Sequence, residues 1–259
     1  TINIPAGFLS NNLAISLLND ETYCLVPRLL NKEKVGVNMH FTPHAERNHF
    51  IIDSSNIVKD GMNTIFPYDY IGIYNRKKFI QLGGFDYTIK SSYWQNLDLA
   101  VRSWLWGEET KLTTMIQFSY IDELPCIDTT INKDYLTYHL KNELPKIKND
   151  EVFISKLSYF DFLLNSSCGY IEARRRFFAA KEWVEKNKFK FKKDLQSIRD
   201  MLPKDVELNA YRFNGKQFYY RYSKRNYSYY NNELTVSEIS RLSSAIDMLS
   251  RFRGLPNYT

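Results

Sequence analysis

Alternating stretches of apolar and polar positions predict a mixed α/β protein. Apolar residues from Phe8 to Leu18 have helical spacing, and the short apolar run Tyr70 to Tyr74 is typical of a buried strand. Residues 23–30 are rich in strand-forming residues, but Pro27 interrupts them, so we expect an edge strand or a bent one. Residues 31–69 are polar, irregular and broken by prolines, which is typical of a long functional loop.

The clearest pattern lies between residues 70 and 120. A short helix with Asn75 as its cap ends at Gly83-Gly84. A second helix ends at Gly107 and carries one apolar stripe, made of Trp94, Leu97, Val101, Trp104 and Leu105. A strand from Lys111 to Tyr120 follows. We therefore expect the strand at 70–74 to be central, with the helices 76–82 and 95–106 flanking a cleft.

The second half of the sequence predicts a mainly helical region. We expect a loop from Pro125 to Asp150 and then helices at 150–164, 171–186, about 190–201 and 236–252. Between the last two helices, Asn214-Gly215 is typical of a tight hairpin turn. This order predicts two domains, an α/β domain over residues 1–148 and a basic, mainly helical domain with a Tyr-rich hairpin over residues 149–259.

Charge divides the chain into two parts. Of its 259 residues, the first 168 hold 16 Lys and Arg against 19 Asp and Glu, and the last 91 hold 19 against 10. The last third therefore carries +9 of formal charge. Clustered positive charge attracts phosphate-bearing glycans, anionic lipids or nucleic acid, although a solvated basic helix face has the same composition.

Cysteine usage and hydropathy favour a cytoplasmic protein. Cys24, Cys126 and Cys168 are separate and odd in number, so they predict neither a disulfide framework nor a zinc site. No window approaches the roughly 18 consecutive apolar residues of a membrane span. We expect a cytoplasmic chain, peripheral to the inner face of the membrane if the basic end binds lipid.

One ordered series of motifs resembles a known family. The series is Tyr70-Ile-Gly-Ile-Tyr74, then Gly83-Gly84-Phe85-Asp86, then Trp94-Gln95-Asn96-Leu97-Asp98 opening a helix that ends at Gly107. It resembles the acceptor-side half of family-two, GT-A type glycosyltransferases, in which a Gly-Gly-Phe-Asp turn precedes a Glu-Asp-x-Asp-Leu helix start. The resemblance covers residues 70–120 well, 1–69 loosely and the last hundred not at all. It implies part of a GT-A, Rossmann-like mixed sheet with flanking helices.

The resemblance implies a set of candidate site residues. The candidate catalytic carboxylates are Asp98 and Asp86, and the candidate substrate-binding residues are Gly83, Gly84, Phe85, Trp94, Gln95, Asn96 and Arg102. Several have a second interpretation: Gly83-Gly84 as a helix stop, Asp86 as a turn cap, Trp94 as core, and Asp98 as an ion-pair partner of Arg102 one helical turn away. In the catalytic interpretation Asp98 lies at the mouth of a cleft that Asp86 and Gln95 share.

The sequence departs from the family at two points. The family's Glu-Asp pair, whose aspartate is the usual general base, aligns with Gln95-Asn96, and an amide cannot accept that proton. Either Asp98 or Asp86 has taken over, or the protein binds without turnover. No Asp-x-Asp occurs in the sequence. We therefore expect the chain to be the C-terminal part of a longer transferase, with Mg²⁺ or Mn²⁺ held by a donor half that it lacks and no metal within this chain.

Two other clusters carry weaker signals. His40, His44 and His49 suggest either a metal site or, as we prefer because Pro43 interrupts them, a polar loop. Residues 211–230 mix seven tyrosines with arginines and lysines, which suits contact with sugars, bases or a lipid interface and equally a half-buried hairpin.

Two functions follow. The first is a glycosyltransferase of cell-surface polysaccharide biosynthesis, or a fragment of one, that moves a sugar from a nucleotide-sugar to a glycan or lipid-linked acceptor. The second is a non-catalytic module that binds an anionic polymer, which the Gln95-Asn96 pair favours. Nucleic acid is the less favoured partner.

Overall fold

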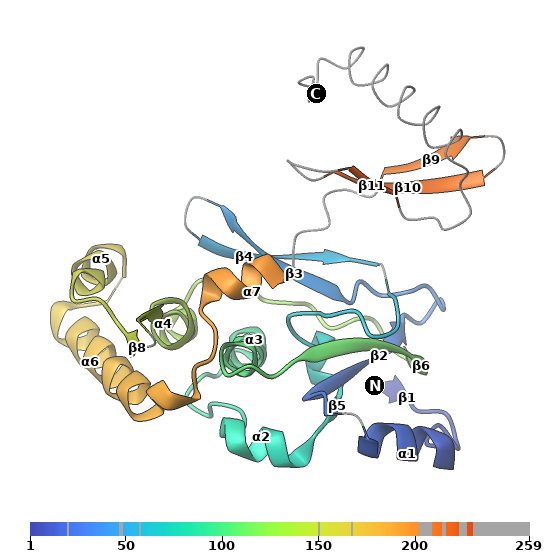
Figure 1. Cartoon of the computed structure of the whole chain (residues 1–259), viewed down its shortest axis with the longest axis horizontal. Helices are drawn as coiled ribbons and strands as arrows, with labels where there is room; N and C mark the ends of the chain where they lie inside the picture. Colours follow the sequence, from blue (N-terminus) through green and yellow to red (C-terminus); the bar gives the residue numbers. More distant parts are fainter. Residues whose placement is uncertain are drawn as a thin grey trace. The chain divides into compact units, whose positions relative to one another are not determined.

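A mixed four-stranded sheet lies at the centre of the first part of the chain (Figure 1). Its strands follow the order β1 (Ile2–Asn3), β6 (Thr110–Tyr120), β2 (Cys24–Leu30) and β5 (Ile73–Tyr74). β2 and β6 are parallel, whereas β1 and β5 pair antiparallel with their neighbours. The predicted mixed α/β class is confirmed.

The computed structural model describes residues 1–201 apart from 20, 47–48, 57, 150 and 167, and beyond them three strands within residues 209–229. The chain forms two units, Thr1–Lys204 and Asp205–Thr259. We had expected a boundary near residue 148. The helices after that point belong to the first unit, because their apolar residues, such as Phe177 and Ile198, join its core.

The strand predicted as central is an edge strand, and it is shorter than expected. Residues 68–70 form a 3₁₀ turn, η1 (Tyr68–Tyr70), in which Asp69 and Tyr70 have φ of 49° and 61°. The chain becomes extended only at Ile73 and pairs with two residues of β2. The prediction of a central strand over 70–74 was therefore wrong.

Pro27 explains the course of β2. The strand is bent as predicted, with a register shift between Pro27 and Arg28, but it lies between β6 and β5 rather than at an edge. A proline is tolerated there because β5 pairs only with Cys24 and Leu25.

A hairpin occupies part of the expected loop at 31–69. β3 (His40–Glu46) and β4 (His49–Ser55) pair antiparallel, with Pro43 opposite Ile52. Pro43 therefore lies in a two-stranded ribbon, and the expectation of a continuous irregular loop was wrong over these residues.

The helices of the first half agree with the sequence pattern. α1 is Asn11–Asn19, α2 is Arg76–Leu82 and α3 is Ser92–Leu105. Asn75 caps α2 by accepting from Lys78 N, and Ser91 caps α3.

The second half contains more regular structure than expected. The predicted loop at 125–150 includes α4 (Lys133–Tyr138), which continues as a π-helical turn, η2 (His139–Glu143). A short ribbon of β7 (Lys146–Lys148) and β8 (Glu151–Phe153) follows. The remaining helices are α5 (Leu157–Asn165), α6 (Tyr170–Asn187), η3 (Lys188–Lys190) and α7 (Leu195–Met201).

The second unit contains the predicted hairpin. β9 (Asn209–Phe213) pairs antiparallel with β10 (Lys216–Tyr222), and Phe213 lies opposite Lys216. A third strand, β11 (Tyr227–Tyr229), extends the sheet on the other side of β10. The helix predicted at 236–252 lies outside the described residues.

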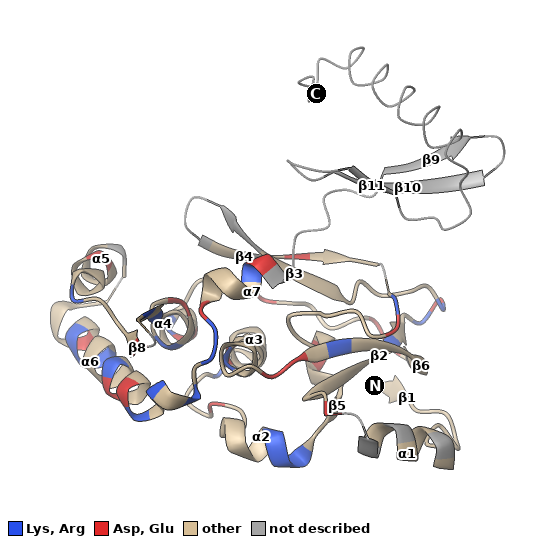
Figure 2. Cartoon of the chain, in the orientation of Figure 1, with Lys and Arg blue, Asp and Glu red and all other residues tan. Residues whose placement is uncertain are grey.

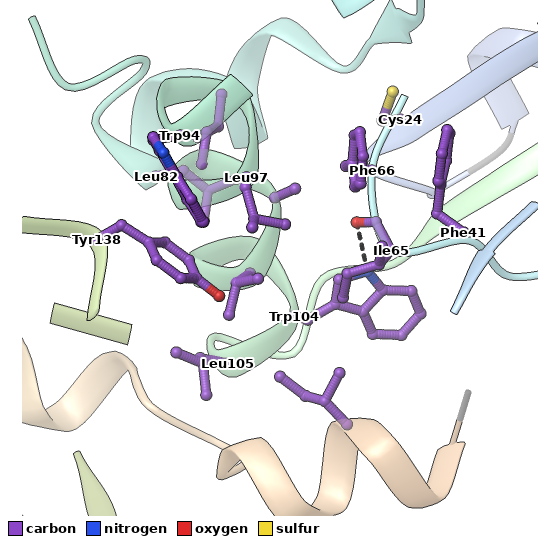
Figure 3. Close-up of a cluster of buried hydrophobic side chains, with 14 of the residues drawn as sticks. Cys24, Phe41, Ile65, Phe66, Leu82, Trp94, Leu97, Trp104, Leu105 and Tyr138 are labelled. Carbon is purple, nitrogen blue, oxygen red and sulfur yellow. Dashed lines mark hydrogen bonds between the residues drawn. The ribbon is translucent and has the colours of Figure 1, made fainter. Parts of the chain in front are cut away.

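The core is built around α3 (Figure 3). Leu97 and Trp104 are almost completely buried on its apolar stripe, and Trp104 Nε1 donates a hydrogen bond of 3.2 Å to Ile65 O. Tyr138 of α4 packs against Trp94, which lies on the same stripe near the start of α3. None of the described helices is long and apolar enough to cross a membrane.

Candidate functional site

The Gly83-Gly84 turn ends α2 and is held from α3. Gly83 and Gly84 have φ of 85° and 64°, which residues with a side chain rarely adopt. Arg102 donates from Nη1 to Leu82 O at 3.0 Å and from Nη2 to Gly84 O at 2.8 Å. Arg102, which we expected to bind substrate, thus positions the turn.

Asp98 is buried and fully engaged. One of its oxygens accepts from Arg102 Nη2 at 3.0 Å, and the other accepts from Asn142 Nδ2 at 2.7 Å. Only 1% of the residue is exposed. The expectation that Asp98 lies at the mouth of a cleft was wrong, and its alternative role as the ion-pair partner of Arg102 is the one observed.

Asp86 lies in the loop after the glycine turn, where its side chain is also occupied. Oδ1 accepts from Thr88 N and Oγ1, and Oδ2 is paired with Lys141. Burial acts to raise the pKa of Asp86, but the hydrogen bonds from Lys141 and Thr88 outweigh it and hold the pKa below its ordinary value. A carboxylate of low pKa is a weak base, so Asp86 is better suited to fixing the loop.

Gln95 and Trp94 also serve the packing of this loop and helix. Gln95 Nε2 donates to Asp86 O and Ile89 O, both at 3.0 Å. Trp94 is buried against Tyr135 and Tyr138 and donates from Nε1 to Thr130 O at 2.9 Å, so its ring is core. Phe85 packs edge to face on Tyr70 and Phe79.

A cleft opens beside the N-terminal end of α3. It encloses about 370 Å³ including its open mouth, and its walls come from η1, from the start of α3 and from the segment after β6. Four of its ten lining residues are aromatic, and Asp69, Ser92 and Asn96 add polar groups: the lining is Phe66, Tyr68, Asp69, Tyr70, Ser92, Tyr93, Asn96, Pro125, Cys126 and Ile127. None of Asp86, Gln95 and Asp98 lines this cleft. Because Asp98 is buried, the expectation that these three approach one shared cleft was wrong. Only Asn96 of the expected residues lines the cleft.

Asn96 lies at the base of the cleft. It is 5% exposed and its Nδ2 donates to Pro67 O at 2.7 Å, which fixes the backbone just before η1. In the resemblance to family-two glycosyltransferases, Asn96 corresponds to the family's general base. The structure thus puts an amide in the cleft where that resemblance implies a carboxylate.

Asp69 is the carboxylate of the cleft, among the residues that line it. It is exposed, and its Oδ2 accepts from Tyr120 Oη at 3.0 Å. Within the described part of the chain, Oδ1 accepts no hydrogen bond, which leaves it available to a ligand. Left-handed backbone at two successive residues with side chains is costly and is most often found at functional sites.

The tyrosines of the cleft remain neutral hydroxyls. Burial and the charge of Asp69 raise the pKa of Tyr70, and the same two causes act on Tyr68. Burial, with a contribution from Glu143, raises the pKa of Tyr93 to about 12. The cleft therefore combines aromatic faces, neutral hydroxyl groups and one negative charge.

Sequence reasoning missed Asp69 and the tyrosines around it. Residues 31–69 were taken together as an irregular loop, and Asp69 belongs to no motif of the family. The available signal was local: directly after Pro67, the acidic residue Asp69 lies between two aromatic residues, Tyr68 and Tyr70.

The described residues contain no group of three His, Cys, Asp or Glu side chains that could hold a metal ion. His40 Nδ1 lies 3.2 Å from Ser55 Oγ, whereas the side chains of His44 and His49 are outside the described part. No model of a known protein family matches the sequence, and no curated protein matches it.

Proposed function

We propose that the cleft at η1 and α3 binds a saccharide, and that the chain is the acceptor-side part of a glycosyltransferase. The single observation that carries this proposal is the composition of the cleft. The partly exposed rings of Tyr70 and Tyr93 offer apolar faces to a sugar ring, and the side-chain oxygens of Asp69, Asn96 and Tyr70 can accept hydrogen bonds from its hydroxyls. The cleft also lies at the helix start where the family resemblance implies the acceptor.

In this proposal Asp69 has the role that the family gives to its helix-start aspartate. Sugar transfer needs a base within hydrogen-bond reach of the acceptor hydroxyl, which attacks the anomeric carbon as the nucleotide diphosphate leaves. Asp69 has a free oxygen on the cleft, and the bond from Tyr120 orients its carboxylate. Asn96 and the tyrosines would hold the acceptor beside it.

The donor would be a nucleotide-sugar and the acceptor a glycan or a lipid-linked sugar. A divalent metal would be bound with the donor, by the donor half that the resemblance implies and not by the cleft described here. The basic, Tyr-rich end would hold the chain near an anionic acceptor or membrane surface.

A non-catalytic saccharide-binding module is the second candidate. Asn96 favours it, because an amide replaces the family's base and its nitrogen is used to hold Pro67 O. The two candidates share the saccharide and differ only in turnover.

A binding experiment with a matched variant tests the shared part. Saturation-transfer NMR with methyl glycosides of common hexoses and N-acetylhexosamines should give contacts with the chain. Asp69→Asn should weaken them by about tenfold or more, because a hydrogen bond to a charged group contributes roughly 1.5–3 kcal/mol. Asp128→Asn is the control, since Asp128 is exposed but does not line the cleft.

The outcomes separate the candidates. Saccharide binding that Asp69→Asn does not change would remove the cleft from the proposal. If binding is confirmed, an assay of sugar transfer by the polypeptide encoded together with any upstream donor half decides between enzyme and module. Binding without transfer there favours the module.

A further inference from the structure

Large apolar side chains lie exposed on the outer faces of α5 and α6. On α5 the spacing i, i+3, i+7 puts them on one side, opposite the buried Phe162. On α6 they lie opposite Ala173 and Phe177, which face the core. The exposed residues are Leu157, Phe160, Leu164, Ile171 and Phe178, of which Leu164 and Ile171 are each 83% exposed.

Ring contacts join the two helix faces into one surface. The Tyr159 ring lies 5.7 Å from that of Phe160 on α5 and 6.1 Å from that of Phe178 on α6. The Arg174 guanidinium lies 5.8 Å from the centre of the Phe178 ring. We call these residues, together with Lys156 and Arg175, the α5–α6 surface.

Positive charge borders the apolar part of this surface. Lys156, Arg174 and Arg175 are exposed, and α6 carries a cluster of basic residues near its start (Figure 2). In the part of the chain that the structure describes, no carboxylate forms an ion pair with any of these three. Arg176, by contrast, is paired with Glu172 at 2.9 Å.

We propose that the α5–α6 surface binds the interface of a bilayer that contains anionic lipids. Leucine, isoleucine and phenylalanine side chains enter the boundary between headgroups and acyl chains, and flanking arginine and lysine attract anionic headgroups. The most exposed residues of the surface, Leu157, Leu164 and Ile171, are aliphatic and cannot stack on bases, so the surface suits lipid better than nucleic acid.

This inference does not depend on the proposed function. It also differs from the expectation for residues 211–230, because the α5–α6 surface belongs to the first unit and Arg221, Lys224 and Arg225 belong to the second. The two surfaces can therefore be tested separately in one chain.

The test is co-sedimentation of the full chain with vesicles. Vesicles of phosphatidylcholine alone are compared with vesicles that also contain phosphatidylglycerol, at low salt and at roughly 1 M salt, where the screening length falls to about 3 Å. Two variants remove the two features of the surface, Leu164→Ser with Ile171→Ser, and Arg174→Glu with Arg175→Glu. Because the changed side chains are exposed, both variants should fold.

Matched controls come from exposed residues elsewhere in the first unit. Ile80→Ser with Ile131→Ser removes two exposed apolar residues, and Arg76→Glu with Lys77→Glu reverses two exposed charges. We expect binding only to the anionic vesicles. Each test variant should lower the partition coefficient by tenfold or more, in line with the contribution of basic residues and of buried apolar area at membranes. The controls should leave it within about twofold.

Four results would overturn the proposal. The first is that the chain binds no vesicles, and the second is that both test variants still bind them. The third is that binding is lost only when Arg221, Lys224 and Arg225 are changed to Glu. The fourth is that the chain does not bind vesicles but forms a concentration-dependent dimer that the Leu164 and Ile171 changes abolish. The last result would identify a second copy as the occupant.

Discussion

Asp98 and Asp69 are carboxylates with opposite surroundings, and this contrast determines their roles. Asp98 is enclosed and accepts hydrogen bonds from Arg102 and Asn142. Asp69 is exposed on an aromatic cleft and has one oxygen with no donor among the described residues. A ligand can therefore reach Asp69 without breaking the fold, whereas it can reach Asp98 only by displacing buried partners.

Replacing Asp98 should destabilise the first unit strongly. Asp98→Ala leaves the buried Arg102 charge with only carbonyl partners, and breaking a buried ion pair typically costs about 3–5 kcal/mol. Urea unfolding followed by tryptophan fluorescence measures this, since Trp94, Trp104, Trp106 and Trp183 all lie in the first unit. Glu21→Ala, at an exposed site, should change stability by less than about 0.5 kcal/mol. A stable Asp98→Ala protein that no longer binds saccharide would return Asp98 to the site.

Gly84 should tolerate no side chain. Its φ of 64° costs other residues about 1–2 kcal/mol, and an added Cβ would lie 3.2 Å from the Phe79 ring. Gly84→Ala should therefore lower the unfolding free energy by that amount or more. The matched control is Gly36→Ala, where a Cβ meets nothing within 4 Å. Equal stability of the two variants would contradict the account of the turn.

Single polar side chains connect the loop after α2 to neighbouring helices. Asp86, in the loop after α2, pairs with Lys141 of η2, and the Lys141 ammonium lies 5.3 Å from the centre of the Trp183 ring on α6. Gln95 of α3 holds the same loop from the other side. The loop that follows the glycine turn is thus fixed to three helical elements.

The Asp86 connection should weaken in acid. The pKa of Asp86 is lower in the folded chain than its ordinary value of 3.8, so its contribution is fully present above about pH 4 and is lost as pH falls through the folded pKa. At neutral pH the wild-type chain should have a larger unfolding free energy than Asp86→Asn. The difference between the two free energies should shrink as the pH falls below about 4. Lys141→Met should show the same narrowing. A gap that is constant with pH would mean that the ion pair does not carry the stability.

Element predictions succeeded where local signals were strong. Asn75 and the two glycines set the ends of α2, and the apolar stripe set α3. The hairpin β3–β4 was missed because Pro43 is typical of a loop, and its acceptance depends on a ribbon that only tertiary structure reveals. α4 was missed although Asn132 caps it, because the whole stretch from Pro125 to Asp150 was expected to be one loop.

The site was predicted less well than the fold for a physical reason. The glycine pair and the apolar stripe located the turn and the helix start correctly, but burial decided which carboxylate remains accessible. Asp69, Asp86 and Asp98 carry the same charge. Asp86 and Asp98 differ from Asp69 because Lys141, Arg102 and Asn142 donate hydrogen bonds to their carboxylate oxygens. Those partners lie up to 55 residues away in sequence, so spacing alone does not reveal them.

At the scale of the whole molecule, each unit carries a formal charge of +3, and the larger share of the positive charge of the last third lies in the first unit. Within the basic last third, residues 169–204 hold 11 Lys and Arg against 5 Asp and Glu, and residues 205–259 hold 8 against 5. The sequence had directed attention to the Tyr-rich strands, whose side chains lie outside the described part. The charge balance instead gives α6 and the segment after it the larger share.

Both units should contribute to binding of anionic polymers. We expect the full chain to bind a phosphorylated glycan and single-stranded nucleic acid at low salt, with affinity falling steeply beyond roughly 0.15 M, where screening acts over about 8 Å. Changing Arg221, Lys224 and Arg225 to Glu should weaken binding, and so should Arg174→Glu with Arg175→Glu. Because the two sets lie in different units, their free-energy effects should add in the combined variant.

Titrations at several salt concentrations measure both the affinity and how steeply it falls with salt. Stronger binding of the glycan would favour the transferase, and nucleic acid binding alone would favour the module. An unchanged affinity in all three variants would show that the positive charge only solvates the surface.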